Sequence, residues 1–187
     1  MPRQPDPGVE ERILNAAQKL WQKGGEKALT MRAVAKAAGT NTPTIYRRFK
    51  NRRDIVFALV QRVRQDVVRA LQPSRSPEET CVRYIEFASS HRHEYKLLYA
   101  RTHELLQSLR SRGRPTVLDS TIIVELIRKQ LAERLGGSAP ECTRLSLALW
   151  ALAHGTATLL ISNGIPMQQA GELRAAFAAA IDTLVCR

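Results

Sequence analysis

Residues 29–55 read LTMRAVAKAAGTNTPTIYRRFKNRRDI, and this stretch decides the fold. Thr30 can accept free amide hydrogens at the start of a short helix, MRAVAKAA, whose end is marked by Gly39. After a three-residue break, Asn41 can cap a second short helix. Pro43 is tolerated there because the first-turn amides of a helix have no intrahelical partner. The stretch therefore predicts two short helices separated by a turn that contains glycine.

Helices are also predicted on both sides of this stretch. A helix that begins near Val9 carries an apolar face until Gly24-Gly25 stops it, and Asn51 with Asp54 forms a capping signal for a long helix over 52–71. Further helices are predicted over 78–91, 93–110, 116–135, 141–162 and 168–186, separated by breaks rich in glycine and proline. We find no convincing alternating run bounded by hairpin turns, so the predicted fold class is all-α.

The charge of the chain is strongly positive and is concentrated near its start. The formal net charge is +12, and residues 1–55 carry 12 basic and 5 acidic side chains. Such a pole attracts a polyanion, although a solvated surface explains a basic balance equally well. The 44% hydrophobic content is that of an ordinary soluble protein and excludes a disordered chain.

Two short helices split by a glycine turn, the second rich in Asn, Thr, Tyr, Arg and Lys, have the proportions of a DNA-reading helix-turn-helix. Residues 29–55, preceded by the RILNAAQKLW helix, resemble the amino-terminal domain of the tetracycline-repressor (TetR) family. The markers are the Thr30 cap, the Ala35-x-x-Ala38-Gly39 turn and the run from Ile45 to Lys50. The resemblance covers residues 9 to about 60 and implies a dimeric bacterial transcription repressor with a helix-turn-helix over about 31–50.

The candidate DNA-binding residues follow from side-chain chemistry and agree with this resemblance. A helix amino terminus at Thr30 can bind a DNA phosphate. Tyr46 and Lys50 are expected one turn apart, so that both side chains can contact the DNA backbone. The start of the recognition helix meets base edges, and Arg47 can reach a guanine or a phosphate. Capping alone also explains Thr30 and Asn41. The full set is Thr30, Thr40, Asn41, Thr42, Thr44, Tyr46, Arg47 and Lys50.

The remaining chain is expected to form a ligand-binding and dimerisation domain over 61–187, after a flexible amino terminus over 1–8 and the DNA-binding domain over 9–60. The Pro- and Ser-rich segment 73–77 interrupts the helical pattern and is the best candidate for a boundary along the chain. The last two predicted helices are apolar on wide faces and need cover, which a partner subunit would supply. Family resemblance implies that these helices pair with their mates in a four-helix homodimer interface.

Candidate effector contacts are few, because pockets in such regulators are mostly apolar with a few polar groups. Trp150-Ala-Leu-Ala-His154-Gly155 resembles the Trp-His-Gly signature of one branch of the family, with looser spacing. A core tryptophan, a satisfied core histidine and a glycine that lets helices cross closely explain the same residues. The candidates for binding a small, largely apolar effector are Tyr95, Tyr99, His103, Trp150 and His154.

No metal or cofactor is expected. His91 and His93 project about 200° apart on a helix, as the 100° step per residue of a 3.6-residue turn requires, and lack a partner at fixed spacing. Cys81, Cys142 and Cys186 are odd in number and far apart, which favours small buried residues in a reducing compartment. With no apolar signal core and no membrane-spanning run recognised, we expect a cytoplasmic protein that associates with the nucleoid when bound to DNA and makes no membrane contact.

An enzyme that acts on nucleic acid is the main alternative from another class. The sequence offers no Gly-rich phosphate loop, no H-E-x-x-H pair and no nucleophile in a recognisable elbow, so no enzymatic activity is predicted. A transcriptional activator, or a regulator that responds to a protein partner, stays open as a closer alternative. The operator, the regulated genes and the effector are not encoded in any recognisable motif.

Overall fold

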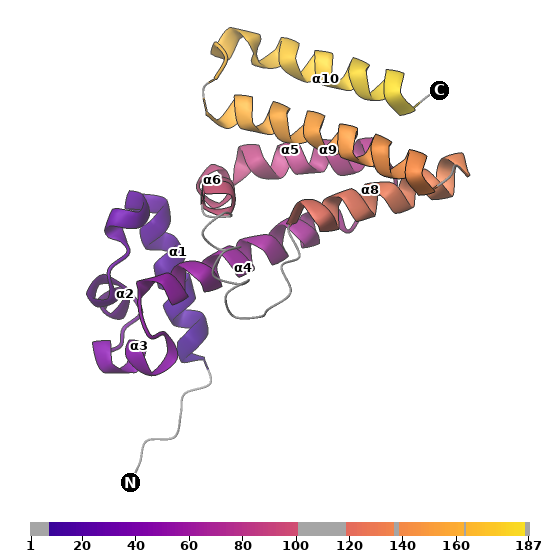
Figure 1. Cartoon of the computed structure of the whole chain (residues 1–187). Helices are drawn as coiled ribbons and strands as arrows, with labels where there is room; N and C mark the ends of the chain where they lie inside the picture. The colour runs from indigo at the N-terminus through magenta and orange to yellow at the C-terminus, as the bar shows by residue number, and fades with distance from the viewer. Residues whose placement is uncertain (1–7, 101–118, 137–138, 163, 186–187) are drawn as a thin grey trace.

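The computed structural model describes residues 8–100, 119–136, 139–162 and 164–185. Within these ranges it contains helices and no strands, which confirms the all-α prediction. Figure 1 shows a small amino-terminal domain joined by one long helix to a layered second domain. The α-helices are α1 (Val9–Ala28), α2 (Met31–Ala37), α3 (Thr42–Arg48), α4 (Arg52–Leu71), α5 (Pro77–Ser90), α6 (Arg92–Ala100), α8 (Asp119–Leu135), α9 (Ala139–Ile161) and α10 (Ala170–Val185), and a short 3-10 helix covers Met167–Gln169.

The amino-terminal domain packs α1, α2 and α3 around a small core. Ile13, Val34 and Ile45 supply one fully buried side chain from each of these helices. The predicted break after the first helix is present, because Gly24 and Gly25 leave helical geometry, although helical hydrogen bonding resumes as far as Ala28. The apolar face predicted from the sequence therefore packs α1 against α2 and α4.

Helix α4 runs from the small domain into the second domain, as Figure 1 shows. Its bounds, Arg52–Leu71, are those predicted, and its buried residues Leu59, Val63 and Val67 recur at helical spacing. One continuous helix therefore connects the two domains.

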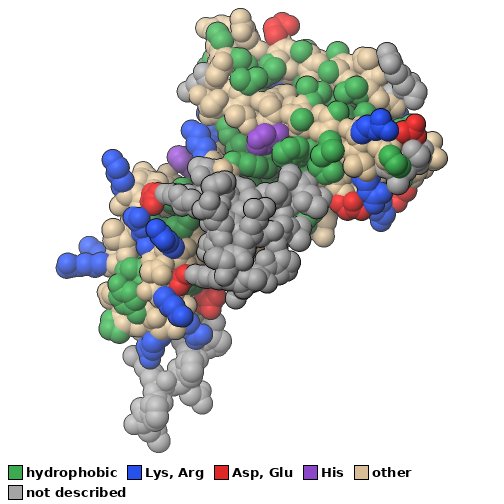
Figure 2. Space-filling view, viewed as in Figure 1, with side chains coloured by type: hydrophobic (Ala, Val, Ile, Leu, Met, Phe, Trp, Pro, Cys, Tyr) green, Lys and Arg blue, Asp and Glu red, His purple; other side chains and the backbone are tan. Residues whose placement is uncertain are grey.

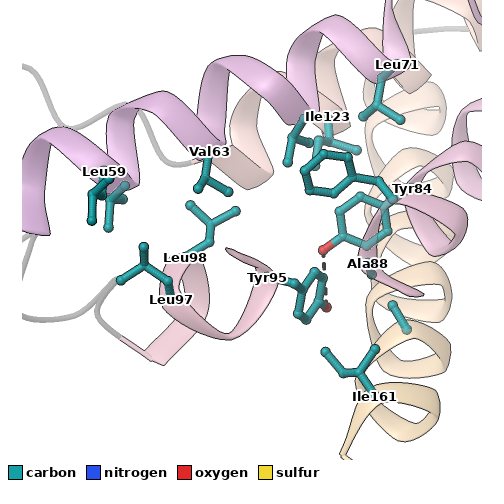
Figure 3. Packing of buried hydrophobic residues seen from close by; sticks show 14 of the residues in the cluster. Leu59, Val63, Leu71, Tyr84, Ala88, Tyr95, Leu97, Leu98, Ile123 and Ile161 are labelled. Atoms are coloured by element: carbon teal, nitrogen blue, oxygen red, sulfur yellow. Dashed lines mark hydrogen bonds between the residues drawn. The ribbon is translucent and has the colours of Figure 1, made fainter. Parts of the chain in front are cut away.

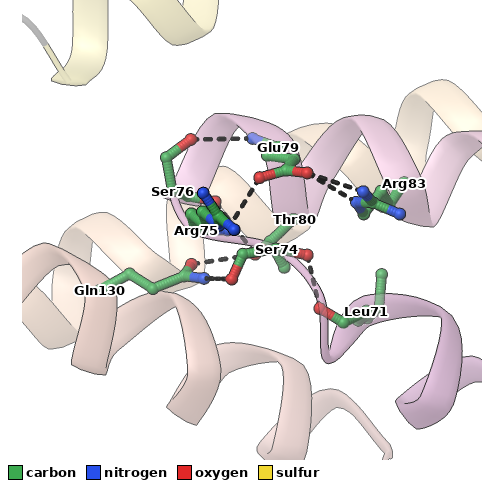
Figure 4. A network of polar contacts seen from close by, with 8 residues as sticks. All are labelled: Leu71, Ser74, Arg75, Ser76, Glu79, Thr80, Arg83 and Gln130. Atoms are coloured by element: carbon green, nitrogen blue, oxygen red, sulfur yellow. Dashed lines mark hydrogen bonds and ion pairs between the residues drawn. The ribbon is translucent and has the colours of Figure 1, made fainter.

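A polar network fixes the corner between α4 and α5 (Figure 4). Thr80 donates to the side-chain oxygen of Gln130 on α8 at 2.9 Å, and the amide nitrogen of Gln130 donates to the backbone oxygen of Ser74 at 3.1 Å. Ser76 caps α5 by accepting the backbone N–H of Glu79. The predicted break over 73–77 is therefore a corner held to α8, and Pro77 is already the first residue of α5.

The second domain buries one face each of α5, α6, α8 and α9. Figure 3 shows Leu97 and Leu98 of α6 directed toward Leu59 and Val63 of α4. Tyr84 of α5, 1% exposed, fills the space between α6 and α9. The second half of the helix predicted over 93–110 lies outside the described residues.

Helix α9 changes one expectation from the sequence. Residues 140–161 are long and apolar enough to cross a membrane by length and composition, contrary to the prediction that no such run exists. The core helix of a soluble protein meets the same criterion, and α9 packs against α5, α8 and α10. Only 33% of its most apolar window is buried within the chain, however, so much of this helix lacks cover.

Candidate DNA-binding and effector sites

The recognition helix α3 turns one face to the core and the other to solvent. Ile45 is fully buried, whereas Tyr46 is 53% exposed and Arg47 is exposed beside it. Thr42 and Thr44 are half-buried, and Asn41 is exposed at the start of the helix. The structure thus places polar and basic candidate residues together on one accessible face.

Both predicted helix caps are present. The Thr30 hydroxyl oxygen accepts the backbone N–H of Ala33 at 3.1 Å, and the Asn41 side-chain oxygen accepts the backbone N–H of Thr44 at 2.9 Å. Gly39 has φ +64°, the left-handed conformation that permits the tight turn between α2 and α3. Thr40, half-buried, continues this turn by donating its backbone N–H to the Ala35 carbonyl.

Lys50 does not lie on the recognition helix, which corrects the expected one-turn relation with Tyr46. Helix α3 ends at Arg48, and Phe49 is extended with a buried side chain. The backbone N–H of Lys50 donates to a carboxylate oxygen of Asp54 at 3.0 Å, so the start of α4 takes the amide that a longer α3 would have used. The Lys50 side chain remains exposed beside the carboxyl end of α3.

Arg47 is held by its own helix. Its guanidinium donates to the hydroxyl of Thr44 at 2.9 Å, one turn earlier on the same exposed face. Figure 2 shows Lys and Arg side chains projecting from the amino-terminal domain, while Asp and Glu are few on the face in view. The exposed face of α3 therefore lies in a region of positive potential, which suits a phosphate backbone.

A second group of polar side chains, the Tyr–His cluster, lies inside the second domain. It joins α5, α6 and α9. Tyr95 and Tyr84 place their hydroxyls 2.9 Å and 3.0 Å from Nδ1 of His154, and Tyr99 lies 2.6 Å from the Tyr84 hydroxyl. Tyr95 also reaches the Thr158 hydroxyl at 3.2 Å. Figure 3 shows the Tyr84 and Tyr95 hydroxyls turned toward each other.

Burial sets the protonation of the cluster. It lowers the pKa of His154, so the imidazole is neutral at pH 7, and it raises the pKa of Tyr84 and of Tyr95, which stay protonated. Trp150 stacks on His154 with the ring centroids 5.2 Å apart. The described members are therefore neutral hydrogen-bonding groups on an aromatic wall.

The sequence predicted only part of this cluster. Tyr95, Tyr99, Trp150 and His154 come together, whereas His103 lies outside the described residues. The sequence analysis missed Tyr84 and Thr158. Tyr84 sits on an apolar stripe with Cys81, Ile85 and Ala88 and thus resembles a core residue. Thr158 follows His154 by four residues, and this spacing could have revealed it.

Helix α6 also contacts the amino-terminal domain through Glu94. The buried Glu94 carboxylate accepts hydrogen bonds from the side-chain amides of Gln18 and Gln22 on α1, and the Trp21 indole donates to the His93 carbonyl at 3.3 Å. Burial raises the pKa of Glu94, but hydrogen bonds from Gln22, from its own backbone and from Gln18 outweigh this effect and lower the pKa. Glu94 and the cluster residue next to it thus connect α6 to both domains.

Other sequence expectations have mixed outcomes. Cys81 and Cys142 are buried and unpaired, as expected, while Cys186 lies outside the described residues. Gly155 does not serve a close crossing within the chain, because a Cβ atom placed there would meet nothing within 4 Å. In the described ranges, no group of three or more His, Cys, Asp or Glu residues has the geometry to hold a metal ion.

A helix-turn-helix joined by one long helix to an all-α second domain defines a DNA-binding regulator of transcription. Comparison with family models supports this class over most of the chain. Residues 13–59 match bacterial regulatory proteins of the tetR family, and residues 78–184 match the tetracyclin repressor-like C-terminal domain. The chain belongs to the TetR family, whose members are non-enzymatic regulators.

Solved structures show the same fold. A transcriptional regulator from Rhodococcus sp. Rha1 is similar with a TM-score of 0.69 and 18% identity, over 93% of this chain and 94% of that one. A TetR variant from Acinetobacter baumannii AYE in complex with minocycline is similar with a TM-score of 0.60 and 18% identity, over 98% of this chain and 96% of that one. The multidrug binding protein EbrR complexed with imidazole is similar with a TM-score of 0.61 and 21% identity, over 99% of this chain and 94% of that one. The chain matches no curated protein.

Proposed function

We propose that this regulator is a cytoplasmic repressor that binds a near-palindromic operator as a homodimer and is released by a small, largely apolar effector. The observation that carries the effector step is the position of two adjacent residues on α6. Glu94 is bound to α1 of the DNA-binding domain, and Tyr95 is bound to His154 in the second domain. A ligand that moves α6 would therefore act directly on the DNA-binding domain.

Operator recognition is assigned to the exposed face of α3 and its flanks. We assign base reading to Thr40, Asn41, Thr42 and Thr44 at the start of the helix, and backbone contacts to Thr30, Tyr46 and Lys50. Arg47 reaches either a guanine or a phosphate. Since one short helix reads few bases, two copies on a two-fold symmetric site supply the selectivity.

The homodimer is proposed from the uncovered side of the last two helices. On α9, the exposed Leu147, Ala148, Ala151 and Leu159 follow one another at helical spacing, and the half-buried Gly155 falls within the same stripe. Leu184 is exposed on α10. Small residues let helices approach closely, so a second copy would cover this stripe and give Gly155 the close crossing that it lacks within one chain.

Effector binding is assigned to the Tyr–His cluster, with Tyr95, Tyr99, Trp150 and His154 as the proposed contacts and His103 retained from the sequence. The complexes of similar proteins with minocycline and with imidazole support a small-molecule effector. The effector must prefer the conformation that does not bind DNA, because each tenfold loss of operator affinity requires about 1.4 kcal/mol of differential binding.

Gel-shift titration of the purified protein against its own upstream DNA tests the operator assignment. A shift that is sensitive to salt and resistant to competitor DNA is expected, with footprinted half-sites spaced by whole helical turns. The absence of such a shift contradicts the proposal. In vitro transcription from the same promoter separates a repressor from an activator, because a repressor lowers the transcript yield.

Two equally exposed apolar residues provide a matched test of the dimer. Leu147 on α9 is 48% exposed, and Val82 on α5 is 44% exposed. In sedimentation analysis, Leu147→Asp is expected to shift the protein toward monomer, whereas Val82→Asp keeps the dimer, since only the first buries a charge in the proposed interface. A Leu147→Asp protein that remains as dimeric as the parent overturns this interface.

A further inference from the structure

A buried indole donor in the effector domain has no partner. The indole Nε1 of Trp150 is shielded from solvent and makes no hydrogen bond. An indole nitrogen can only donate, and a buried donor without an acceptor is rare in folded proteins because it has lost its water. The other tryptophan, Trp21, donates to the His93 carbonyl at 3.3 Å. The Trp150 indole is therefore a buried donor that lacks an acceptor.

The unpaired indole adjoins the Tyr–His cluster. Trp150 precedes His154 by one helical turn on α9, and their rings stack with 18° between the planes. Two phenol hydroxyls approach Nδ1 of His154, so that nitrogen is assigned as the acceptor, and the single proton of the neutral ring falls on Nε2. This face of α9 consequently carries two ring N–H donors one turn apart.

Among the described residues, the cluster also contains no charged side chain. Its described members, Tyr84, Tyr95, Tyr99, Trp150, His154 and Thr158, include no carboxylate. The nearby carboxylate in the sequence, Glu94, is already bound to Gln18 and Gln22 of α1. Neither a cationic nor an anionic ligand would find an opposite charge among these groups, whereas an uncharged acceptor oxygen would find an unsatisfied donor.

We propose that the effector is a small, mainly apolar, uncharged carbonyl compound whose oxygen accepts the hydrogen bond of Trp150 Nε1. This inference rests on the proposed effector function and adds the chemical class of the ligand. The aromatic rings of the cluster contact its apolar part, and the acceptor oxygen satisfies the indole. Amines of the same size lack the acceptor and bind less well.

Four probes of one carbon skeleton test this class: phenylacetamide, phenylacetate, 2-phenylethylamine and ethylbenzene. Isothermal titration and the shift of the thermal unfolding midpoint are measured on the full-length protein. Phenylacetamide is expected to bind tenfold or more tightly than the carboxylate, the amine and ethylbenzene. Equal binding of all four, preference for the carboxylate or for the amine, or no binding at 10 mM overturns the proposal.

Two tryptophan variants assign the effect to one nitrogen. Trp150→Phe is expected to reduce the affinity for the preferred carbonyl probe about tenfold and to leave ethylbenzene binding unchanged. Trp21→Phe removes an indole outside the cluster that already has a partner, so any effect that it exerts through the α1–α6 contact is expected to change both affinities equally. Undiminished carbonyl binding in Trp150→Phe overturns the proposal, and the probe preference of the parent protein decides the question if this variant does not fold.

The outcomes separate the ligand class from the proposed function. If the carbonyl probe binds with the expected preference but leaves operator affinity unchanged, the acceptor site stands and its role as the release signal fails. If the probe preference is absent while an unrelated compound releases the operator, the proposed function stands and the ligand class fails.

Discussion

The Tyr95 hydroxyl lies 2.9 Å from Nδ1 of His154, although 59 residues separate the two in sequence. This contact ties α6 to α9 inside the second domain. Glu94, the neighbour of Tyr95, is bound to α1. These two adjacent residues of α6 therefore link the Tyr–His cluster to the DNA-binding domain.

Stability is expected to depend on the protonation of His154. Burial lowers its pKa below the ordinary 6.5, so the unfolded chain takes up the proton first as the pH falls. The stabilising effect of the neutral ring is complete above pH 6.5 and is lost as the pH falls from there to the folded pKa, with a slope of up to about 1.4 kcal/mol per pH unit.

Urea denaturation at pH 7.5 and pH 5.5 measures this effect. His154→Gln keeps an acceptor for the phenols and cannot titrate, so its free energy of unfolding should fall less between the two pH values than that of the parent. All other titrating groups are common to both proteins and cancel in the comparison. Equal losses in the two proteins would remove His154 as the source.

Glu94→Ala is expected to lower the free energy of unfolding by about 1–3 kcal/mol, because it removes a charged acceptor shared by two amides. Gln18 and Gln22 retain access to water, which favours the lower part of this range. Glu86→Ala, on the exposed side of α5, serves as the control and is expected to change stability by less than about 0.5 kcal/mol. Chemical denaturation measures the free energy of unfolding of both variants. Equally small losses in the two variants would show that the α1–α6 contact is not stabilising.

Asn41 can be tested separately as a cap and as a DNA contact. Asn41→Ala removes the acceptor for the Thr44 amide and should cost about 0.5–2 kcal/mol of stability. Asn41→Asp keeps a good cap and so should preserve stability, but its negative charge faces the DNA phosphates. Operator affinity of Asn41→Asp is therefore expected to fall by about tenfold or more, which corresponds to about 1.4 kcal/mol. Unchanged affinity would leave this residue with capping alone.

Lys50→Ala should weaken binding to specific and nonspecific DNA alike, because a phosphate contact carries no sequence information. The plot of log affinity against log salt should become shallower by about 0.9 per subunit. Lys129→Ala on α8 removes the same charge from the second domain and should leave the slope unchanged. Fluorescence anisotropy over a salt series gives both slopes, and an unaltered slope for Lys50→Ala would remove Lys50 from the phosphate contacts.

The amino-terminal domain was predictable because its signals are local. A cap such as Thr30 or Asn41 bonds an amide three residues away, and Gly39 supplies a positive φ where the turn needs it. These interactions act within a few residues, so the chain specifies them before any tertiary contact forms. The error at Lys50 arose because the start of α4 takes its amide hydrogen and ends α3 early.

The second domain shows what only the tertiary structure decided. The sequence predicted helices over 78–91, 93–110 and 141–162, but it could not tell which of their faces meet, because apolar burial is not directional. Packing of the three helices turned Tyr84 from an apparent core residue into a hydrogen-bonding neighbour of His154, and it left the Trp150 indole without an acceptor. The sequence by itself thus determined the helix-turn-helix and its caps, whereas the Tyr–His cluster and its contact with the DNA-binding domain exist only once distant helices pack together.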